Sequence, residues 1–234
     1  MAHDPTGATA AFAELGHIKL DETDLDGVLN QVTDLARRTL PGAAQVSITL
    51  LRDRGAVTAA HTGAIALRLD ELQYERGTGP CLEAAEAKAV VEVPDTAADG
   101  RWEGWGAEAA LAGMGSVLSL GLPIRDDVSG ALNVYGADAR AFDDCTVTLA
   151  QTLGGYASVA LGNVHLYGVT AGLARDMRAA MESRAVIEQA KGIIMGERRC
   201  TPDEAFAILA KLSQDTNRKL RDVAVALVEG TQRG

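Results

Sequence analysis

The chain has few cysteines and no long apolar segment. Its three cysteines, Cys81, Cys145 and Cys200, are widely spaced, so they form neither a disulfide framework nor a metal-binding cluster. No run of about 20 apolar residues occurs, and the N-terminus has no signal-peptide pattern. We therefore predict a cytoplasmic protein with no metal site and no membrane partner.

Motifs of catalysis are also missing. The sequence contains no phosphate-binding loop, metal-ligand pair or nucleophile elbow, and no phospho-acceptor receiver domain. His61 and His165 stand alone, and a lone histidine is weak support for a haem ligand. We predict no catalytic residues and no enzyme activity, and the sequence does not identify a cofactor.

Basic residues are concentrated at the C-terminal end of an acidic chain. The whole sequence has 22 Lys/Arg against 32 Asp/Glu, a net charge of −10, whereas Ser183 to Gly234 carry nine against seven. Attraction to phosphate depends on the local field and not on the overall isoelectric point. This end is a candidate nucleic-acid surface, although an ordinary solvated helical surface has a similar charge pattern.

The segment from Arg184 to Glu229 has the periodicity of three short helices. Apolar residues recur at spacings of three and four from Val186 to Ile194 and from Leu220 to Val228. The middle helix has a clear start, because Thr201 can cap it and Glu204 completes a capping box. We predict a small three-helix bundle, which has little interior for catalysis and is suited to presenting a surface.

The order of residues in this segment resembles the ANTAR domain, an RNA-binding output module of bacterial antiterminators. The match runs through residues 183–234 without an evident gap. The resemblance implies a partner of structured RNA (paired stem-loops), usually bound by a dimer. It is carried by Ile187-x-x-Ala190-Lys191-Gly192-Ile193-Ile194-Met195, by Glu204-Ala205-Phe206-x-x-Leu209 and by Ser213-x-x-x-Asn217-x-x-Leu220-x-x-x-Ala224.

The resemblance suggests RNA contacts, each of which also has a structural interpretation. Lys191 matches the family's lysine, but its stem could lie along the bundle. Gly192 costs about 1 kcal/mol in a helix interior and suggests close approach of a neighbouring helix or of RNA. Asn217 could cap the start of the third helix, and Ser213 could be a helix-end polar group. Basic candidates flank this corner or extend the patch: Arg218, Lys219, Arg221, Arg184 and Arg198.

The larger N-terminal part has the pattern of an α/β domain. An amphipathic helix is predicted over Leu25 to Ala36, and a short helix follows Gly77-Thr78-Gly79-Pro80. The order of elements predicts a central antiparallel sheet with helices on its faces. Strands are predicted at Val46 to Leu50, Ala56 to Thr62, Ala89 to Val93, Val117 to Ile124 and Ser129 to Tyr135, with turns at Arg52-Asp53-Arg54-Gly55 and Asp126-Asp127.

This part resembles a GAF domain, a class of small-molecule or redox sensors. The resemblance implies a sensed signal, but the fold does not supply the ligand. It is carried by Gly77-x-Gly79-Pro80-Cys81-Leu82-Glu83-Ala84, Val91-x-Val93-Pro94-Asp95, Asp99-x-Arg101-Trp102 and the strand segments 116–124 and 130–135.

Three residues are candidates for contact with the signal. Cys81 falls in the first turn of a predicted helix, where the helix dipole lowers the pKa of a thiol and favours the reactive thiolate. A buried structural cysteine is the commoner case. Trp102 and Trp105 could form the wall of a pocket in this aromatic-poor chain, or they could pack in the core.

One long helix, from Thr146 to about Arg184, is predicted to join the two parts. A 3–4 heptad seam along it predicts a parallel coiled-coil dimer, although its first half could pack on the sensor domain instead. Several seam positions are polar or small, so the pairing would be weak. The seam consists of Val159, Asn163, Leu166, Thr170, Leu173, Met177, Ala180, Arg184 and Ile187.

The predicted fold is α+β: a GAF-like antiparallel sheet flanked by helices, a long connector helix and a C-terminal three-helix bundle. Its parts are a flexible leader (1–20), a sensor domain (21–165), a helical connector (166–182) and an RNA-binding domain (183–234). The functional hypothesis is a signal-responsive, homodimeric RNA-binding regulator of antitermination or translation. Two alternatives are a DNA-binding helix-turn-helix regulator and a GAF-type methionine sulfoxide reductase that uses Cys81.

Overall fold

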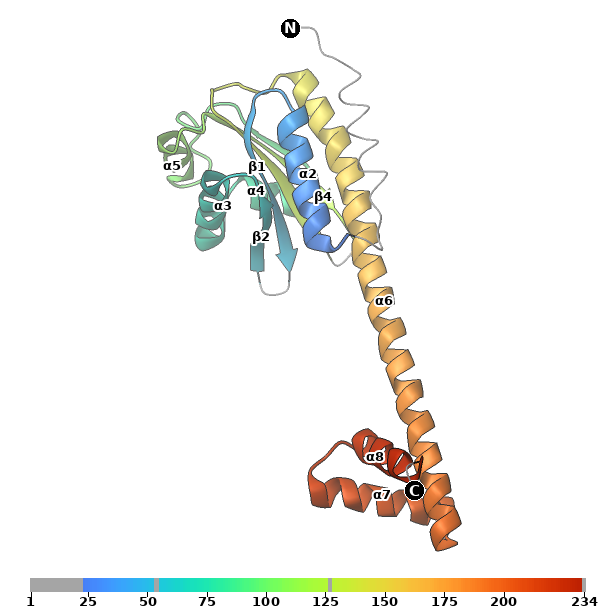
Figure 1. Ribbon diagram of the computed structural model, residues 1–234. Helices are drawn as coiled ribbons and strands as arrows, with labels where there is room; N and C mark the ends of the chain where they lie inside the picture. The colour runs from blue at the N-terminus through green and yellow to red at the C-terminus, as the bar shows by residue number, and fades with distance from the viewer. Residues whose placement is uncertain (1–22, 53–54, 126–127, 233–234) are drawn as a thin grey trace. The chain divides into compact units, whose positions relative to one another are not determined.

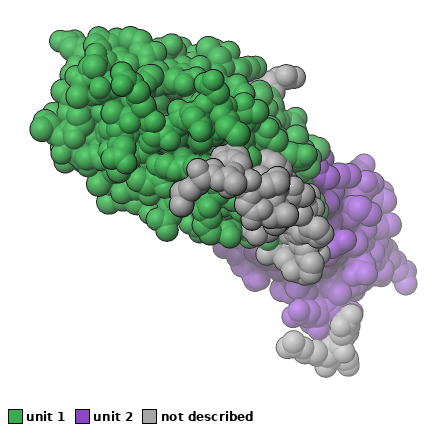
Figure 2. Space-filling model, turned by 90° about the horizontal axis from the view of Figure 1, so that it is seen from above, with its two compact units in different colours: residues 1–168 green, residues 169–234 purple. Residues whose placement is uncertain are grey.

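The structure, a computed structural model, describes residues 23–52, 55–125 and 128–232. The predicted leader at 1–20 and the tips of the two predicted turns, 53–54 and 126–127, lie outside the described residues. The chain divides into two compact units, Met1–Gly168 and Val169–Gly234 (Figure 2). None of the helices in the described ranges is long and apolar enough to cross a membrane.

A five-stranded antiparallel sheet forms the centre of unit 1, as predicted. Its strand order is β2-β1-β5-β4-β3. The two long strands β1 and β5 lie side by side, and their register pairs Ile48 with Leu132 and Thr49 with Ala131. The strands are β1 (Ala43–Arg52), β2 (Gly55–His61), β3 (Val90–Val93), β4 (Ser116–Pro123) and β5 (Ser129–Gly136).

Helices cover both faces of this sheet, so each face contributes to a core (Figure 1). On one face Ile48 and Leu132 pack with Leu153 of α6, and on the other Tyr135 packs with Leu69 and Trp105. The first face is covered by α2 (Leu25–Thr39) and the N-terminal part of α6 (Asp144–Arg198), the second by α3 (Ala64–Arg76), α4 (Pro80–Ala87) and α5 (Trp105–Leu111).

Two helices of the second face, α3 and α5, are absent from the sequence-based prediction. The buried residues of α3 include Asp70 and Gln73 beside Leu69, so its inward face lacks a continuous apolar stripe. The seven-residue α5 begins after Gly104, whose φ of 69° places it in the left-handed region. A helix with a polar buried face and a helix of two turns both give weak apolar periodicity.

In unit 2 the C-terminal part of α6 packs with α7 (Pro202–Thr216) and α8 (Leu220–Gln232). The predicted capping box of α7 is present, with the Glu204 backbone N–H donating to Thr201 Oγ1 and the Thr201 N–H to Glu204 Oε2. The small core of this unit is formed by Ala190, Ile194, Ala205, Leu209, Val223 and Ala224.

The prediction of a separate, short first helix in this bundle is wrong. α6 runs for 55 residues from Asp144 to Arg198, so the predicted connector helix and the first helix of the bundle are one element. No proline interrupts this range. Its glycines each cost about 1 kcal/mol relative to Ala in a helix, which is too little to end one that is packed at both ends.

Candidate sensor site and nucleic-acid interface

A buried polar cluster lies between the sheet of unit 1 and its α3–α5 face, centred on Asp70. The Tyr135 hydroxyl donates to Asp70 Oδ1 at 2.6 Å, and Thr58 Oγ1 donates to Asp70 Oδ2 at 3.0 Å. Asn133 Nδ2 lies 3.3 Å from Asp70 Oδ1 and 3.0 Å from Thr49 Oγ1. One carboxyl therefore links α3 to β2 and β5 through hydrogen bonds.

The groups that hydrogen-bond to Asp70 are neutral, so its charge has no ion-pair partner among them. Burial raises the pKa of Asp70 from 3.8 to about 6, and hydrogen bonds from Ser47, Tyr135 and Thr58 partly oppose that rise. In the described part of the chain, the buried Oδ1 of Asn133 has no hydrogen-bond partner. The cluster is therefore an acceptor-rich interior with an incompletely satisfied amide.

Cys81 lies in the first turn of α4, as predicted, but the predicted lowering of its pKa is wrong. The side chain is fully buried, and burial raises the pKa of the Cys81 thiol well above its usual value, with a further upward contribution from the Asp70 charge. The loss of hydration outweighs the helix dipole at this position. Cys81 is held as a neutral thiol in the core.

Trp102 and Trp105 pack in the interior of unit 1. Their ring centroids are 6.0 Å apart in an edge-to-face arrangement with an interplanar angle of 85°. The Trp105 indole N–H donates to the Leu69 carbonyl oxygen at 3.0 Å, and the Arg101 guanidinium lies 4.4 Å from the centroid of Trp102. This arrangement matches the core-packing interpretation of the two residues.

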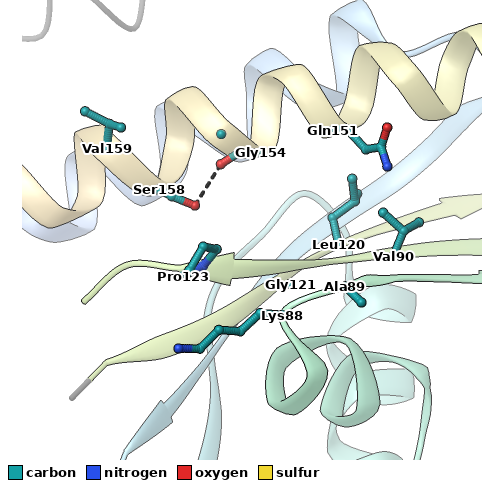
Figure 3. Close-up of a pocket in the computed structure, with 11 residues that line it drawn as sticks. Lys88, Ala89, Val90, Leu120, Gly121, Pro123, Gln151, Gly154, Ser158 and Val159 are labelled. Carbon is teal, nitrogen blue, oxygen red and sulfur yellow. Dashed lines mark hydrogen bonds between the residues drawn. The ribbon is translucent and has the colours of Figure 1, made fainter. Parts of the chain in front are cut away.

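A hollow of about 660 Å³ lies between α6 and the edge of the sheet formed by β3 and β4 (Figure 3). Leu120, Gln151 and Ser158 are among the residues that line it. The Ser158 hydroxyl donates to the Gly154 carbonyl oxygen of its own helix at 2.8 Å, so its proton is not available to a ligand. None of the predicted sensing residues lines this hollow.

The corner between α7 and α8 brings together five of the predicted RNA-contact residues. Arg218 and Lys219 are exposed. The Ser213 hydroxyl donates to the Arg218 carbonyl oxygen at 2.6 Å, and the Arg218 N–H donates to the Ser213 carbonyl oxygen at 3.1 Å. These bonds fix the corner with its cationic side chains outward. The five residues are Ser213, Asn217, Arg218, Lys219 and Arg221.

The prediction that Asn217 caps the start of the third helix is wrong. Asn217 is the C-cap of α7 with φ 51° and ψ 34°, and its N–H bonds to carbonyl oxygens of that helix. Asparagine tolerates the left-handed conformation better than most residues, which explains its presence. Its side chain is exposed at the corner, so a role as an RNA contact stays a prediction.

Lys191 is a largely buried residue of α6 and is paired within its own helix. Its Nζ is 3.0 Å from each carboxylate oxygen of Glu188, and its side chain is only 16% exposed. A Cβ added at the neighbouring Gly192 would meet nothing within 4 Å. Within the described residues no neighbouring helix approaches this glycine closely, so that explanation is wrong here, and RNA contact remains a prediction.

The other basic candidates are exposed along α6 and α8. Arg221 of α8 is 3.6 Å from Glu182 of α6, an ion pair in which both side chains are largely solvated. Arg184 and Arg198 are exposed on α6. The candidates thus form two groups, one at the α7–α8 corner and one along α6.

The Asp70 cluster is the part of the candidate site that the sequence-based analysis missed. A usable signal was present in the strands: Ser47 and Thr49 of β1 and Asn133 of β5 are polar residues beside strongly apolar neighbours. All three are fully buried because helices cover both sheet faces. Polar residues at alternate positions of a central strand indicate a buried hydrogen-bond network when the sheet has two covered faces.

These features define a class of protein: a sensor-like domain with a buried polar centre, and a small helical unit that presents basic side chains. The family model of the GAF domain matches residues 22–162 and that of the ANTAR domain matches residues 175–228. The chain belongs to the GAF domain family and carries a C-terminal ANTAR domain. This content supports an RNA-binding regulator with a sensor domain and fits a regulator better than an enzyme.

Solved structures with the same fold include GAF domains and free methionine-R-sulfoxide reductases. The GAF domain of a phosphoenolpyruvate-protein phosphotransferase from Coxiella burnetii has a TM-score of 0.53 at 14% identity, covering 70% of this chain and 98% of that one. A free methionine-R-sulfoxide reductase from Neisseria meningitidis, in complex with its substrate, has a TM-score of 0.53 at 15% identity, covering 68% and 89%. At this identity the likeness shows the fold alone. No match to a curated protein is found.

Proposed function

We propose that this protein is a cytoplasmic, signal-responsive regulator that binds paired stem-loop RNA and thereby controls transcription antitermination or translation. The observation that carries the proposal is the basic surface of the ANTAR unit. Arg184, Arg198, Arg218 and Lys219 are exposed on a unit whose interior is a small apolar core. Exposed cations suit electrostatic contact with a phosphate backbone.

The GAF unit supplies the signal in this proposal, as a small-molecule or redox sensor. The polar centre around Asp70 links α3 to β2 and β5, so a change there would alter the packing of several elements together. Cys81, Trp102 and Trp105 border this interior but are buried. They would respond to a signal through packing, since none of them is accessible to a ligand in this conformation.

The regulator acts as a homodimer in this proposal. Val159, Leu173 and Met177 of the predicted seam are each about 60% exposed on α6. Large apolar side chains at heptad spacing on a solvent-exposed helix favour parallel pairing with a second helix. The central seam positions Asn163 and Thr170 are polar, so the pairing would be weak enough for a signal to shift.

The reductase alternative draws on the reductases among the fold neighbours, but the cysteine chemistry opposes it. A thiol-dependent reductase needs a reactive thiolate, and burial keeps Cys81 protonated. The basic surface of the ANTAR unit also has no role in such an enzyme.

The positions of the basic residues oppose the DNA-binding helix-turn-helix alternative. They lie at a helix corner and along α6 and do not line one recognition helix.

Competition binding tests the proposal directly. We expect a labelled RNA hairpin to bind the full chain at least about tenfold more tightly than duplex DNA of the same sequence. The Lys191→Ala variant should lose affinity by about tenfold or more, since contacts to charged groups are worth about 1.5–3 kcal/mol. Lys211→Ala, at an exposed lysine outside the candidate set, is the control.

Each result has a defined meaning. Unchanged affinity of Lys191→Ala would remove Lys191 from the interface while leaving the function intact. Failure of any oligomeric form to bind RNA hairpins would reject the proposed function. Preference for duplex DNA would favour the helix-turn-helix alternative.

A further inference from the structure

The hollow between α6 and the β3–β4 edge exists because one face of the helix lacks large side chains. The α6 residues that line it follow the spacing i, i+3, i+4, i+7 and i+8, which places them on a single helix face. Two consecutive glycines on that face leave about 660 Å³ open, where a protein interior is normally filled by side chains (Figure 3). The five residues are Gln151, Gly154, Gly155, Ser158 and Val159.

The helix backbone requires neither glycine. Both lie within α6, and neither is among the glycines with positive φ. A Cβ added at Gly155 would meet nothing within 4 Å, and one added at Gly154 would come no closer than 3.5 Å, to Leu122. Glycine destabilises a helix relative to alanine, and the local structure gives no reason for that cost. The effect of the pair is to keep the hollow open.

Two polar side chains at the hollow, Lys88 and Gln151, make no hydrogen bond or ion pair with another described residue. Gln151 extends from α6, and Lys88 lies on the side of the sheet (Figure 3). Lys88 is the C-cap of α4 with φ 52°, a left-handed conformation that favours glycine. A lysine at this position places a free ammonium group beside the hollow.

The other walls of the hollow are mainly apolar, with Val90, Leu120 and Pro123 on the side of the sheet. No acidic residue is among the lining residues in the described part of the chain, so the local field favours an anion over a cation. Small-molecule sites typically have volumes of about 300–1000 Å³, apolar walls and a few polar groups that fix the orientation of the ligand. The hollow has each of these properties.

From these features we propose that the hollow binds a small organic anion with an apolar aliphatic or aromatic body and one carboxylate. Lys88 binds the carboxylate, and Gln151 is available to a polar substituent on the body. The body occupies the space that Gly154 and Gly155 leave open.

Such a ligand contacts α6 and the sheet together, within unit 1. It therefore changes the packing of the helix that continues into unit 2. The inference gives the proposed sensor a ligand class, and it rests on the proposed function only for the role of that ligand as a signal.

Filling the hollow tests the site in the full chain. Anilinonaphthalene sulfonate, a fluorescent probe with an aromatic body and one anionic group, reports on binding. Gly155→Leu places a side chain in the open space and also raises helix propensity. We expect this variant to fold, as far-UV circular dichroism would show, and to bind the probe about tenfold more weakly or less, because the space is occupied. Gly168→Leu, at an exposed glycine of α6 outside the hollow, should bind as the wild type does.

A second experiment tests the charge of the ligand by displacement of the same probe. Decanoate and naphthoate should displace it from the wild type, and decyltrimethylammonium should not. Lys88→Met should weaken decanoate binding by about tenfold, as loss of a contact between charged groups predicts, and should leave binding of neutral decanol unchanged. Lys211→Met, at an exposed lysine of unit 2, is the control. The tighter of the two carboxylates identifies an aliphatic or an aromatic body.

The outcomes are independent of RNA binding, because the assays contain no RNA. If neither carboxylate displaces the probe, or if Gly155→Leu binds the probe as tightly as the wild type, the site is overturned. An equal loss of decanoate and decanol binding in Lys88→Met would overturn the anionic ligand class. A wild type that binds the carboxylates but no RNA hairpin would reject the proposed function and support the site.

Discussion

Asp70 is the residue in the sensor unit whose chemistry differs most from its surroundings. A carboxyl with no counter-ion is costly to bury in its charged form, so the interior favours the protonated acid. Tyr135, Thr58 and Asn133 hold it in place through hydrogen bonds from separate elements. A change in its protonation therefore alters hydrogen bonds in the sheet and in α3 together.

Stability should depend on pH through this residue. The folded pKa of Asp70, about 6, lies above its ordinary value of 3.8. Its contribution to stability is present below pH 4 and is lost as the pH rises through 6. An Asp70→Asn variant, which stays neutral, should therefore gain stability relative to the wild type between pH 4 and pH 7, by at most about 3 kcal/mol.

Urea unfolding of both proteins across this pH range measures the difference. Glu75→Gln, at an exposed position of the same helix, is the control and should show no such trend. A difference between Asp70→Asn and the wild type that stays constant with pH would show that Asp70 is already ionised in the folded protein.

Asn217 is the C-cap of α7 and also a candidate RNA contact, and substitution can separate these two roles. Asn217→Gly keeps the left-handed backbone at φ 51° without strain, whereas Asn217→Ala costs about 1–2 kcal/mol in that conformation. We expect Asn217→Gly to be as stable as the wild type but to bind RNA several-fold more weakly. Wild-type RNA affinity of the glycine variant would leave Asn217 as a helix cap only.

Among the elements, α6 contributes to the cores of both units. Its residues Leu153 and Leu161 belong to the core of unit 1, and Ala190 and Ile194 to that of unit 2. A single continuous helix transmits a rotation or shift along its axis more directly than two helices joined by a loop. The proposed signal could therefore pass from the core of unit 1 to that of unit 2 along α6.

Because the core of unit 2 is small, we expect the stability of that unit to depend strongly on each buried side chain. Leu209 of α7 is fully buried, and a buried Leu→Ala change costs about 2–5 kcal/mol. Leu209→Ala should unfold unit 2 at a temperature that leaves unit 1 folded. Because Trp102 and Trp105 are the only tryptophans and lie in unit 1, their fluorescence reports on unit 1, and far-UV circular dichroism reports on both.

The Leu212→Ala variant controls for the removal of a leucine side chain from an exposed position of α7. Leu212 is on the same helix but 47% exposed, so its truncation should have a small effect. If Leu209→Ala unfolds both units in one transition, the two units do not fold independently.

The sequence predicted elements well where their faces are uniformly apolar or clearly capped. The strands around Ile48 and Leu132 and the capping box at Thr201 have such local signals, and all are present. The helix α3 was missed because its buried face carries Asp70 and Gln73, which bond to groups outside the helix, Asp70 to Tyr135 and Gln73 to the Cys81 N–H. The prediction of a lowered pKa for Cys81 was wrong for a similar reason, because burial is set by tertiary packing.

For RNA binding by the whole molecule, the distribution of charge over the chain matters more than the net charge. A net charge of −10 repels nucleic acid at long range, and the exposed basic residues of unit 2 have to act locally. Salt screens charges beyond about 8–10 Å under physiological conditions. These basic residues can therefore attract phosphate at short range even though the rest of the chain is acidic.

The salt dependence of RNA binding counts the contacts made by the assembled molecule. Each phosphate contact contributes a slope of roughly −0.9 to a plot of log K against log salt for a duplex. In the proposed homodimer each candidate RNA contact occurs twice, so Arg184→Ala should reduce the slope by about 2 rather than 1. Arg178→Ala should leave it unchanged. A reduction of about 1 would mean that only one copy contacts the RNA through Arg184, and the RNA would then lie on one subunit instead of across the pair.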